Sequence, residues 1–195
     1  MKKLIFNFGT MNSAKTANLL MKKYEYEEQG YSVLLIKPII DNRDGIDIVK
    51  SRIGLSSKCK PIEKSDNLTE INWYKYDILM VDEAQFLTKE QIKQLHLLSL
   101  KIDVICYGLL SDFKQEAFEG SLELFVLADE RNSIEKICRC GNLANFNARF
   151  DKEGKFIENG NQVLIGGNEQ YQAVCKHCYE KLQRYKTINC LDKYF

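Results

Sequence analysis

The chain has 195 residues, of which 45% are hydrophobic, and its 28 basic and 27 acidic side chains leave a formal net charge of +1. This length and apolar content suit one domain, or one domain with a small appendage, around a buried core. The balanced charge argues against broad, non-specific nucleic-acid binding, although not against a local phosphate site.

We expect no targeting signal in the amino-terminal segment. Lys2 and Lys3 precede a short, mostly apolar run that ends at Gly9, which is too short for a signal peptide, and no stretch approaches a membrane span. We therefore expect a cytoplasmic protein with no membrane partner. In that compartment the seven cysteines are expected to be thiols or metal ligands rather than disulfides.

The first predicted strand, residues 4–8, leads into a loop with the layout of a phosphate-binding loop. The segment 9–16, GTMNSAKT, matches G-x-x-x-x-G-K-[ST] except at Ala14. Such a loop directs backbone N–H groups and a helix dipole at phosphate oxygens. We expect Lys15 to reach the β and γ phosphates and the Thr16 hydroxyl to hold Mg²⁺.

Ala14 leaves two alternatives open. If this position requires a positive φ, alanine costs about 1 kcal/mol there, and if it does not, the substitution is harmless.

The segments that follow alternate between strand and helix patterns. Helices are predicted at 16–29, 88–98 and 120–128, with Thr88 as a cap, and weak helical character at 67–74. Further strands are predicted at 31–36, 59–62, 77–81 and 102–107, and polar loops at 38–57 and 108–119. This order predicts an α/β fold of the P-loop NTPase (RecA-like) type, a parallel sheet with helices on both faces.

Two adjacent acids follow the predicted strand at 77–81. An acid at the end of such a strand supports Mg²⁺ in P-loop proteins, so Asp82 is assigned to the metal. Glu83 is then free to face a substrate hydroxyl as general base. The sequence DEAQ at 82–85 also resembles the box of helicases, but those enzymes need two such domains and this chain has room for one.

The composition changes after about residue 134, where Cys, Asn and Gly become frequent. Short alternating runs at 145–150 and 162–165 predict a small β subdomain, so we divide the chain into units 1–134 and 135–190. Cys175 and Cys178 have the C-x2-C spacing that lets a turn bind zinc, whereas Cys138 and Cys140 form a C-x-C pair, which is one residue shorter. Together the four thiolates would make a closed, structural Zn²⁺ site. His177 is an alternative to Cys178 as the last ligand.

The loop at 108–120 follows a strand on the side where such sheets bind ligands. Phe113 and Phe118 lie in this polar loop. They are expected either to wall a planar base or to anchor the loop in the core.

Taken together, these stretches resemble the type II (cytosolic, zinc-containing) thymidine kinase family over roughly residues 3–182. The motifs that carry the resemblance are GTMNSAKT, KPIIDNR, SRIG, VDEAQF, YGLLSDFKQEAFEGS, CRCGNLANFNAR and VLIGGNEQYQAVCKHC. The resemblance implies transfer of the ATP γ-phosphoryl group to the 5′-hydroxyl of thymidine, with deoxyuridine as a related substrate, in nucleotide salvage for DNA synthesis. It also implies a structural Zn²⁺, a substrate-covering loop like a lasso, and a homotetramer.

The resemblance assigns roles to individual residues. Glu83 is the catalytic base. ATP and Mg²⁺ are held by Gly9, Thr10, Met11, Asn12, Ser13, Ala14, Lys15, Thr16, Asp41, Arg43 and Asp82. The substrate pocket is lined by Met11, Phe86, Leu109, Phe113, Phe118, Asn147, Leu164, Gly166 and Tyr171, with much of the base bound by main-chain groups of the covering loop.

Two other functions remain open from the sequence. One is a nucleotide-responsive binding module in which a zinc ribbon grips nucleic acid. The other is a kinase of the same fold with another nucleoside as substrate.

Overall fold

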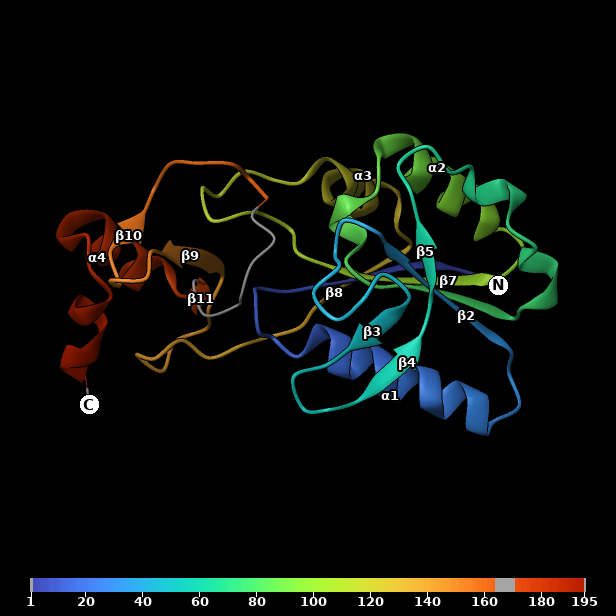
Figure 1. Ribbon diagram of the computed structural model, residues 1–195, viewed down its shortest axis with the longest axis horizontal. Helices are drawn as coiled ribbons and strands as arrows, with labels where there is room; N and C mark the ends of the chain where they lie inside the picture. The colour runs from blue at the N-terminus through green and yellow to red at the C-terminus, as the bar shows by residue number, and fades with distance from the viewer. Residues whose placement is uncertain (1, 164–170, 195) are drawn as a thin grey trace.

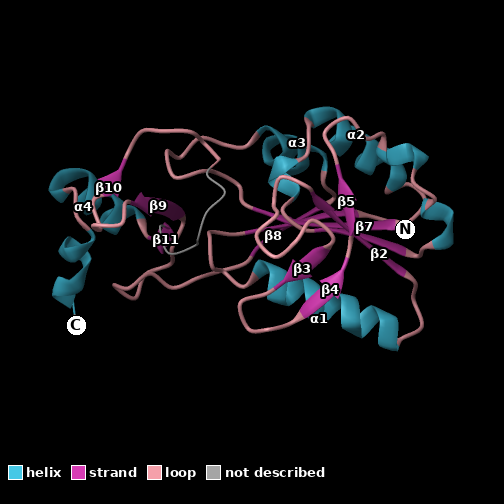
Figure 2. Ribbon diagram, viewed as in Figure 1, coloured by secondary structure: helices cyan, strands magenta, loops and turns pink. Residues whose placement is uncertain are grey.

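The computed structural model describes residues 2–163 and 171–194. Its larger unit is a six-stranded sheet in the order β5-β2-β6-β7-β1-β8, and every neighbouring pair is parallel (Figure 2). The strands are β1 (Leu4–Phe8), β2 (Val33–Pro38), β5 (Lys60–Ile62), β6 (Ile78–Val81), β7 (Asp103–Gly108) and β8 (Glu130–Ser133). The predicted parallel α/β sheet is confirmed.

Helices cover both faces of this sheet (Figure 1). They are α1 (Lys15–Glu28), α2 (Lys89–Leu98) and α3 (Glu119–Leu127). Leu19 and Leu20 of α1 pack with Met80 and Ile105 on one face. Residues of α2 and α3 pack on the other face with Leu79 and neighbouring strand positions. Alternate residues of β6 therefore pack in two separate cores, which explains why this central strand is apolar throughout.

The start of α2 follows the predicted cap. Thr88 Oγ1 accepts a hydrogen bond from the Gln91 N–H at 3.2 Å, and Gln91 Oε1 accepts one from the Thr88 N–H at 3.1 Å. This reciprocal pair is a capping box.

The segment predicted as one polar loop at 38–57 contains a hairpin, so that prediction is wrong over part of its length. Strands β3 (Ile48–Lys50) and β4 (Ser56–Lys58) pair antiparallel. Only Val49 of the two strands is buried, and strands this short and exposed carry little hydrophobic alternation to reveal them. The predicted helical segment at 67–74 forms two short 3₁₀ turns, Leu68–Glu70 and Trp73–Lys75.

A smaller unit lies at the opposite end of the molecule from the N-terminus (Figure 1). It contains the antiparallel sheet β10-β9-β11, followed by α4 (Lys176–Tyr185) and the 3₁₀ helix Ile188–Tyr194. The strands are β9 (Phe146–Phe150), β10 (Phe156–Ile157) and β11 (Tyr171–Val174). This unit has its own core around Phe150, Phe156 and Leu182.

The predicted β run at 145–150 is confirmed as β9. In the predicted run at 162–165, residues 162 and 163 belong to no strand, and residues 164 and 165 lie outside the described residues. No helix in the described ranges is long and apolar enough to cross a membrane.

Candidate active site

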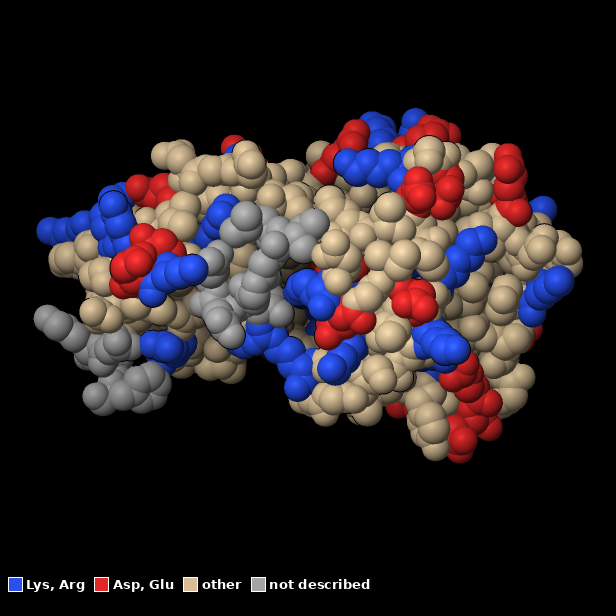
Figure 3. Space-filling view, in the orientation of Figure 1, with Lys and Arg blue, Asp and Glu red and all other residues tan. Residues whose placement is uncertain are grey.

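A cavity of about 930 Å³ lies at the carboxyl ends of β2, β6 and β7, between the sheet and the smaller unit. Ligands bind at this edge in open α/β sheets. Basic and acidic side chains gather on the visible face where the two units meet (Figure 3). The predicted site residues that line the cavity are Met11, Asn12, Ser13, Ala14, Lys15, Thr16, Asp41, Arg43, Asp82, Glu83, Phe86, Leu109, Phe113, Phe118, Asn147 and Tyr171.

The predicted phosphate-binding loop joins β1 to α1. Lys15 Nζ donates hydrogen bonds to the carbonyl oxygens of Gly9 at 3.3 Å and Thr10 at 2.7 Å, so it folds back over the loop. Burial lowers the pKa of Lys15 to about 8. The hydroxyl oxygens of Thr10 and Ser13 are buried without a hydrogen-bond partner. Unpaired buried hydroxyls and a half-buried cation fit a ligand rich in anionic oxygens.

The structure resolves the two alternatives for Ala14. Its φ is +61° and its ψ is +23°, which is the left-handed conformation. Glycine adopts this conformation without steric cost, whereas alanine is strained by about 1–2 kcal/mol. The position therefore does require a positive φ.

Thr16 and Asp82 meet at the start of α1 and the end of β6. The Thr16 hydroxyl donates to Asp82 Oδ2 at 3.1 Å. Burial raises the pKa of Asp82 to about 7, and the neighbouring charge of Glu83 adds to this effect. A hydroxyl beside a desolvated carboxylate is a hard oxygen donor set, which fits Mg²⁺.

Glu83 lies in the cavity wall with both carboxylate oxygens engaged. Arg43 donates from its terminal nitrogen to Glu83 Oε1 at 2.8 Å, and from Nε to Asp41 Oδ1 at 2.6 Å. Glu83 also has a positive φ of 51°, an uncommon conformation that tends to occur at functional sites. The predicted DNR segment and the predicted base are therefore in direct contact.

Aromatic side chains form another part of the cavity wall. The rings of Phe86 and Phe118 pack edge to face with centroids 5.9 Å apart. Phe113 and Phe118 are almost fully buried, as expected for anchors of the loop in the core, and they also line the cavity. Arg149 lies over the rings of Phe113 at 5.1 Å and Tyr171 at 5.9 Å.

Asn147 connects the two units at the cavity. Its Oδ1 accepts a hydrogen bond from the Met11 N–H at 2.7 Å, and its Nδ2 donates to the Ser111 carbonyl at 3.0 Å. Its amide therefore binds main chain on two sides. The predicted substrate residues Leu164 and Gly166 lie outside the described residues.

The sequence prediction did not include four buried polar residues that line the cavity: Lys37, Ser51, Gln85 and Asp112. Lys37 Nζ donates to the carbonyl oxygens of Gly45 and Ile48 at 2.9 and 2.7 Å and lies 3.6 Å from Asp41 Oδ2. It therefore holds the segment 41–48 against β2. The role of Lys37 could have been suspected from the sequence, because it is a charged residue in an otherwise apolar strand. Asp112 Oδ1 accepts from the N–H groups of Lys114 and Glu116, and its Oδ2 is buried without a partner.

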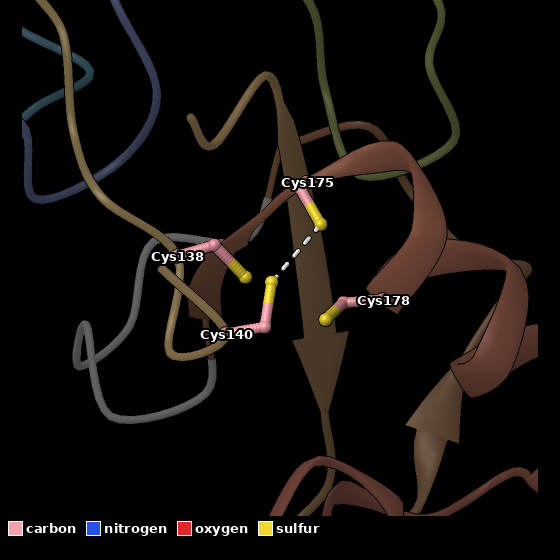
Figure 4. A group of neighbouring side chains, drawn as sticks. All are labelled: Cys138, Cys140, Cys175 and Cys178. Carbon is pink, nitrogen blue, oxygen red and sulfur yellow. Dashed lines mark hydrogen bonds between the residues drawn. The ribbon is translucent and has the colours of Figure 1, made fainter. Parts of the chain in front are cut away.

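The four cysteines predicted as metal ligands come together in the smaller unit (Figure 4), and their sulfur atoms all lie within 4.8 Å of one another. Cys138 and Cys140 lie on a turn before β9, Cys175 caps α4, and Cys178 lies in its first turn. His177 is exposed, so Cys178 rather than His177 completes the cluster.

The sulfur cluster suits zinc. Zn–S bonds of about 2.3 Å place the sulfur atoms of a tetrahedral site about 3.8 Å apart, close to the spacing found here. Asn142 Nδ2 donates to Cys140 Sγ at 3.3 Å, and the hydrogen bonds from Asn142 lower the pKa of Cys140 to about 6. A turn that stabilises thiolate favours metal binding.

Comparison with known proteins agrees with this geometry. The family model described as thymidine kinase matches residues 2–179. The chain is 41% identical to a thymidine kinase of Legionella pneumophila (strain Lens) over 96% of this chain and 94% of that one. It is 43% identical to a thymidine kinase of Shewanella oneidensis over 90% of this chain and 95% of that one.

Among solved structures, the chain is similar to Bacteroides Pif1 bound to single-stranded DNA. The match has a TM-score of 0.36 and 15% identity, and it covers 64% of this chain and 32% of that one. A similarity this weak supports no inference about function.

Proposed function

The chain belongs to the thymidine kinase family, and from this membership we propose how its residues divide the work of phosphoryl transfer. The enzyme is an ATP-dependent phosphotransferase, and its acceptor is the 5′-hydroxyl of thymidine. Glu83 takes the proton of that hydroxyl while the oxygen bonds to the γ-phosphorus. The bond from the γ-phosphorus to the bridging oxygen breaks, and its electron pair leaves with ADP. The products are dTMP and ADP.

One observation carries this proposal: a single cavity brings together the phosphate loop, the paired acids after β6 and the aromatic wall. Phosphoryl transfer depends mainly on positioning and on electrostatic stabilisation, so these groups must share one space.

The phosphate loop binds the triphosphate in this proposal. The segment 9–16 supplies backbone N–H groups, and Lys15 exchanges its two carbonyl contacts for phosphate oxygens. Thr16 and Asp82 would hold Mg²⁺, which would offset the negative charge of the phosphate oxygens. Proximity of Thr16 to Asp82, at 3.1 Å, supports this pairing.

Arg43 and Asp41 act at the transferring group. Arg43 contacts Glu83, so its guanidinium already lies beside the proposed base. An arginine at this position stabilises negative charge that spreads over the phosphoryl oxygens. Asp41 orients that guanidinium through the contact to Nε.

Thymine binds against the aromatic part of the cavity. The proposed contacts are Met11, Phe86, Leu109, Phe113, Phe118, Asn147 and Tyr171, together with Leu164 and Gly166 of the covering loop. A pocket of this apolar character discriminates only weakly against loss of one methyl group. Deoxyuridine, which lacks the 5-methyl group of thymine, is therefore proposed as a second substrate.

We further propose residues 1–134 as the kinase unit and 135–190 as a zinc-binding unit, in a cytoplasmic homotetramer. The separate core of the smaller unit supports the division, and its four-cysteine cluster supports Zn²⁺. Exposed apolar side chains on α3, Leu122, Phe125 and Val126, support association between subunits.

The decisive experiment is Glu83→Gln, assayed with labelled ATP against the four deoxynucleosides. General-base catalysis is worth about 10²–10⁴-fold, so kcat for thymidine should fall by that factor. Glu90→Gln, an exposed change of the same kind on α2, is the matched control and should leave kcat unchanged. Normal turnover by a folded Glu83→Gln protein would exclude Glu83 as the base, and preference for another deoxynucleoside would overturn the proposed substrate.

A further inference from the structure

Gln85 bridges Glu83 to the end of strand β7. Its Nε2 donates to Glu83 Oε2 at 2.5 Å, and its Oε1 accepts from the main-chain N–H of Leu109 at 3.0 Å. Gln85 is only 3% exposed. A buried side chain with both ends of its amide engaged is held in one rotamer.

These two contacts determine which way the amide points. The reversed amide would set an oxygen against the Glu83 carboxylate and an NH₂ group against the Leu109 N–H. Both of those pairings are repulsive, because two acceptors or two donors would face each other. Gln85 therefore donates to Glu83.

The backbone around Gln85 leaves room for this arrangement. A Cβ atom added at Gly108 would lie 2.8 Å from Gln85 Oε1 and 3.2 Å from the Gln85 main-chain nitrogen. The absence of a side chain at Gly108 thus lets the amide reach Leu109. The Gly108 carbonyl also accepts a hydrogen bond from the Gly9 N–H at 3.3 Å, so the same strand end contacts the phosphate loop.

We propose that Gln85 is a positioning residue that holds the Glu83 carboxylate in the orientation needed for catalysis. This inference rests on the proposed role of Glu83 as the base. Gln85 fixes Oε2 while Arg43 fixes Oε1, so the carboxylate is held at both oxygens. A carboxylate oxygen has two lone-pair sites, so Oε2 can accept from Gln85 and still take a proton.

The placement of Leu109 explains why the hydrogen bond from Gln85 to Glu83 matters for catalysis. Leu109 lines the cavity beside the aromatic residues, and its main chain holds the far end of the amide. Gln85 therefore connects the Glu83 carboxylate, through hydrogen bonds, to the part of the cavity wall where the nucleoside is proposed to bind. An error of about 1 Å between a base and its substrate can cost about 10²-fold in rate.

Gln85→Met tests the proposal, because methionine has a similar length and volume but cannot hydrogen-bond. We expect kcat to fall by about 10- to 100-fold, while KM for thymidine and for ATP stays within about twofold, since the cavity wall is retained. Gln91→Met is the matched control. Gln91 is also a buried glutamine, and its Nε2 donates to the carbonyl oxygens of Glu63 and Asp66 rather than to a site residue.

The same change in the Glu83→Gln protein shows whether Gln85 acts through Glu83. If it does, Gln85→Met should have almost no further effect on kcat in that background, because the effects of residues that act as a unit are not additive. Equal losses in both backgrounds would overturn the proposal. Loss of activity in Glu83→Gln with unchanged kcat in Gln85→Met would reject this inference alone, whereas normal activity in Glu83→Gln would reject the proposed function.

Gln85→Asn keeps the test usable if the methionine variant does not fold. An asparagine amide is one methylene shorter and cannot span both partners, so kcat should again fall with little change in KM. A folded Gln85→Asn protein with the kcat of the unmodified enzyme would contradict the proposal.

Discussion

Asn147 Oδ1 lies 2.7 Å from the main-chain nitrogen of Met11 and accepts its hydrogen bond. Asn147 belongs to β9 of the smaller unit, and Met11 belongs to the phosphate loop. Since the other end of the amide binds Ser111, one side chain connects the smaller unit to the phosphate loop and to the loop that carries Phe113.

Asn147→Ala should therefore weaken the binding of both ATP and thymidine. Removing the amide leaves two main-chain groups without their partner, at a cost of about 1–3 kcal/mol in the free energy of unfolding. KM for ATP and KM for thymidine should both rise, because the connection reaches both sides of the cavity. Steady-state kinetics with each substrate varied in turn measures this. Asn145→Ala, an exposed change just before the same strand, is the control, and an effect of Asn147→Ala on thymidine alone would argue for a purely substrate-binding role.

Ala14→Gly should stabilise the free protein rather than tighten ATP binding. Ala14 has the left-handed conformation in the folded protein, and we expect the loop to keep it when ATP binds, so the strain should be common to the free and bound states. We expect a gain of up to about 1 kcal/mol in the free energy of unfolding and no change in KM for ATP.

Thermal unfolding and ATP kinetics together check this prediction. Ala17→Gly, the same chemical change within helix α1, should instead destabilise the protein by about 1 kcal/mol. A large fall in KM for ATP in Ala14→Gly, with unchanged stability, would show that the loop changes conformation on binding.

The parts of the fold that the sequence predicted are those with a strong local signal. Strand β6 is an unbroken apolar run whose four residues are all buried, and α2 begins at a capping box. The strand β8 was not predicted, because its residues are polar and mostly exposed at the sheet edge and its pairing with β1 is long-range. Helix α4 was also missed, since its one cysteine, Cys178, was interpreted only as a metal ligand.

In the candidate site, too, the residues predicted from the sequence are those with a strong local signal. Lys15, Thr16, Asp82 and Glu83 could be proposed because fixed offsets after a strand identify them. The function of Gln85 depends on Leu109, a partner far along the chain whose distance no local pattern contains. Contacts of this kind require the folded structure.

Because α3 exposes apolar side chains, we predict that subunits associate through this helix. Leu122 and Val126 are 56% and 65% exposed, and burying them against another subunit removes apolar surface from water. Leu122→Glu combined with Val126→Glu should shift the protein to a smaller assembly, measured by light scattering or sedimentation. Lys64→Glu, an exposed change in a loop, is the charge control. An unchanged mass for the double variant would place the subunit contact elsewhere.

Removal of the proposed zinc ion should unfold the smaller unit before the six-stranded sheet. The four sulfur atoms join the turn at Cys138 and Cys140 to the start of α4, and structural zinc sites supply much of the folding energy of small domains. Chelation, or Cys175→Ser, should therefore produce a separate transition at lower temperature and faster hydrogen exchange in β9 and α4. Cys59→Ser changes a cysteine outside the cluster and should retain a single transition. Because Asn147 connects this unit to Met11, the chelated protein should also lose affinity for both substrates, and full activity after complete zinc removal would contradict that connection.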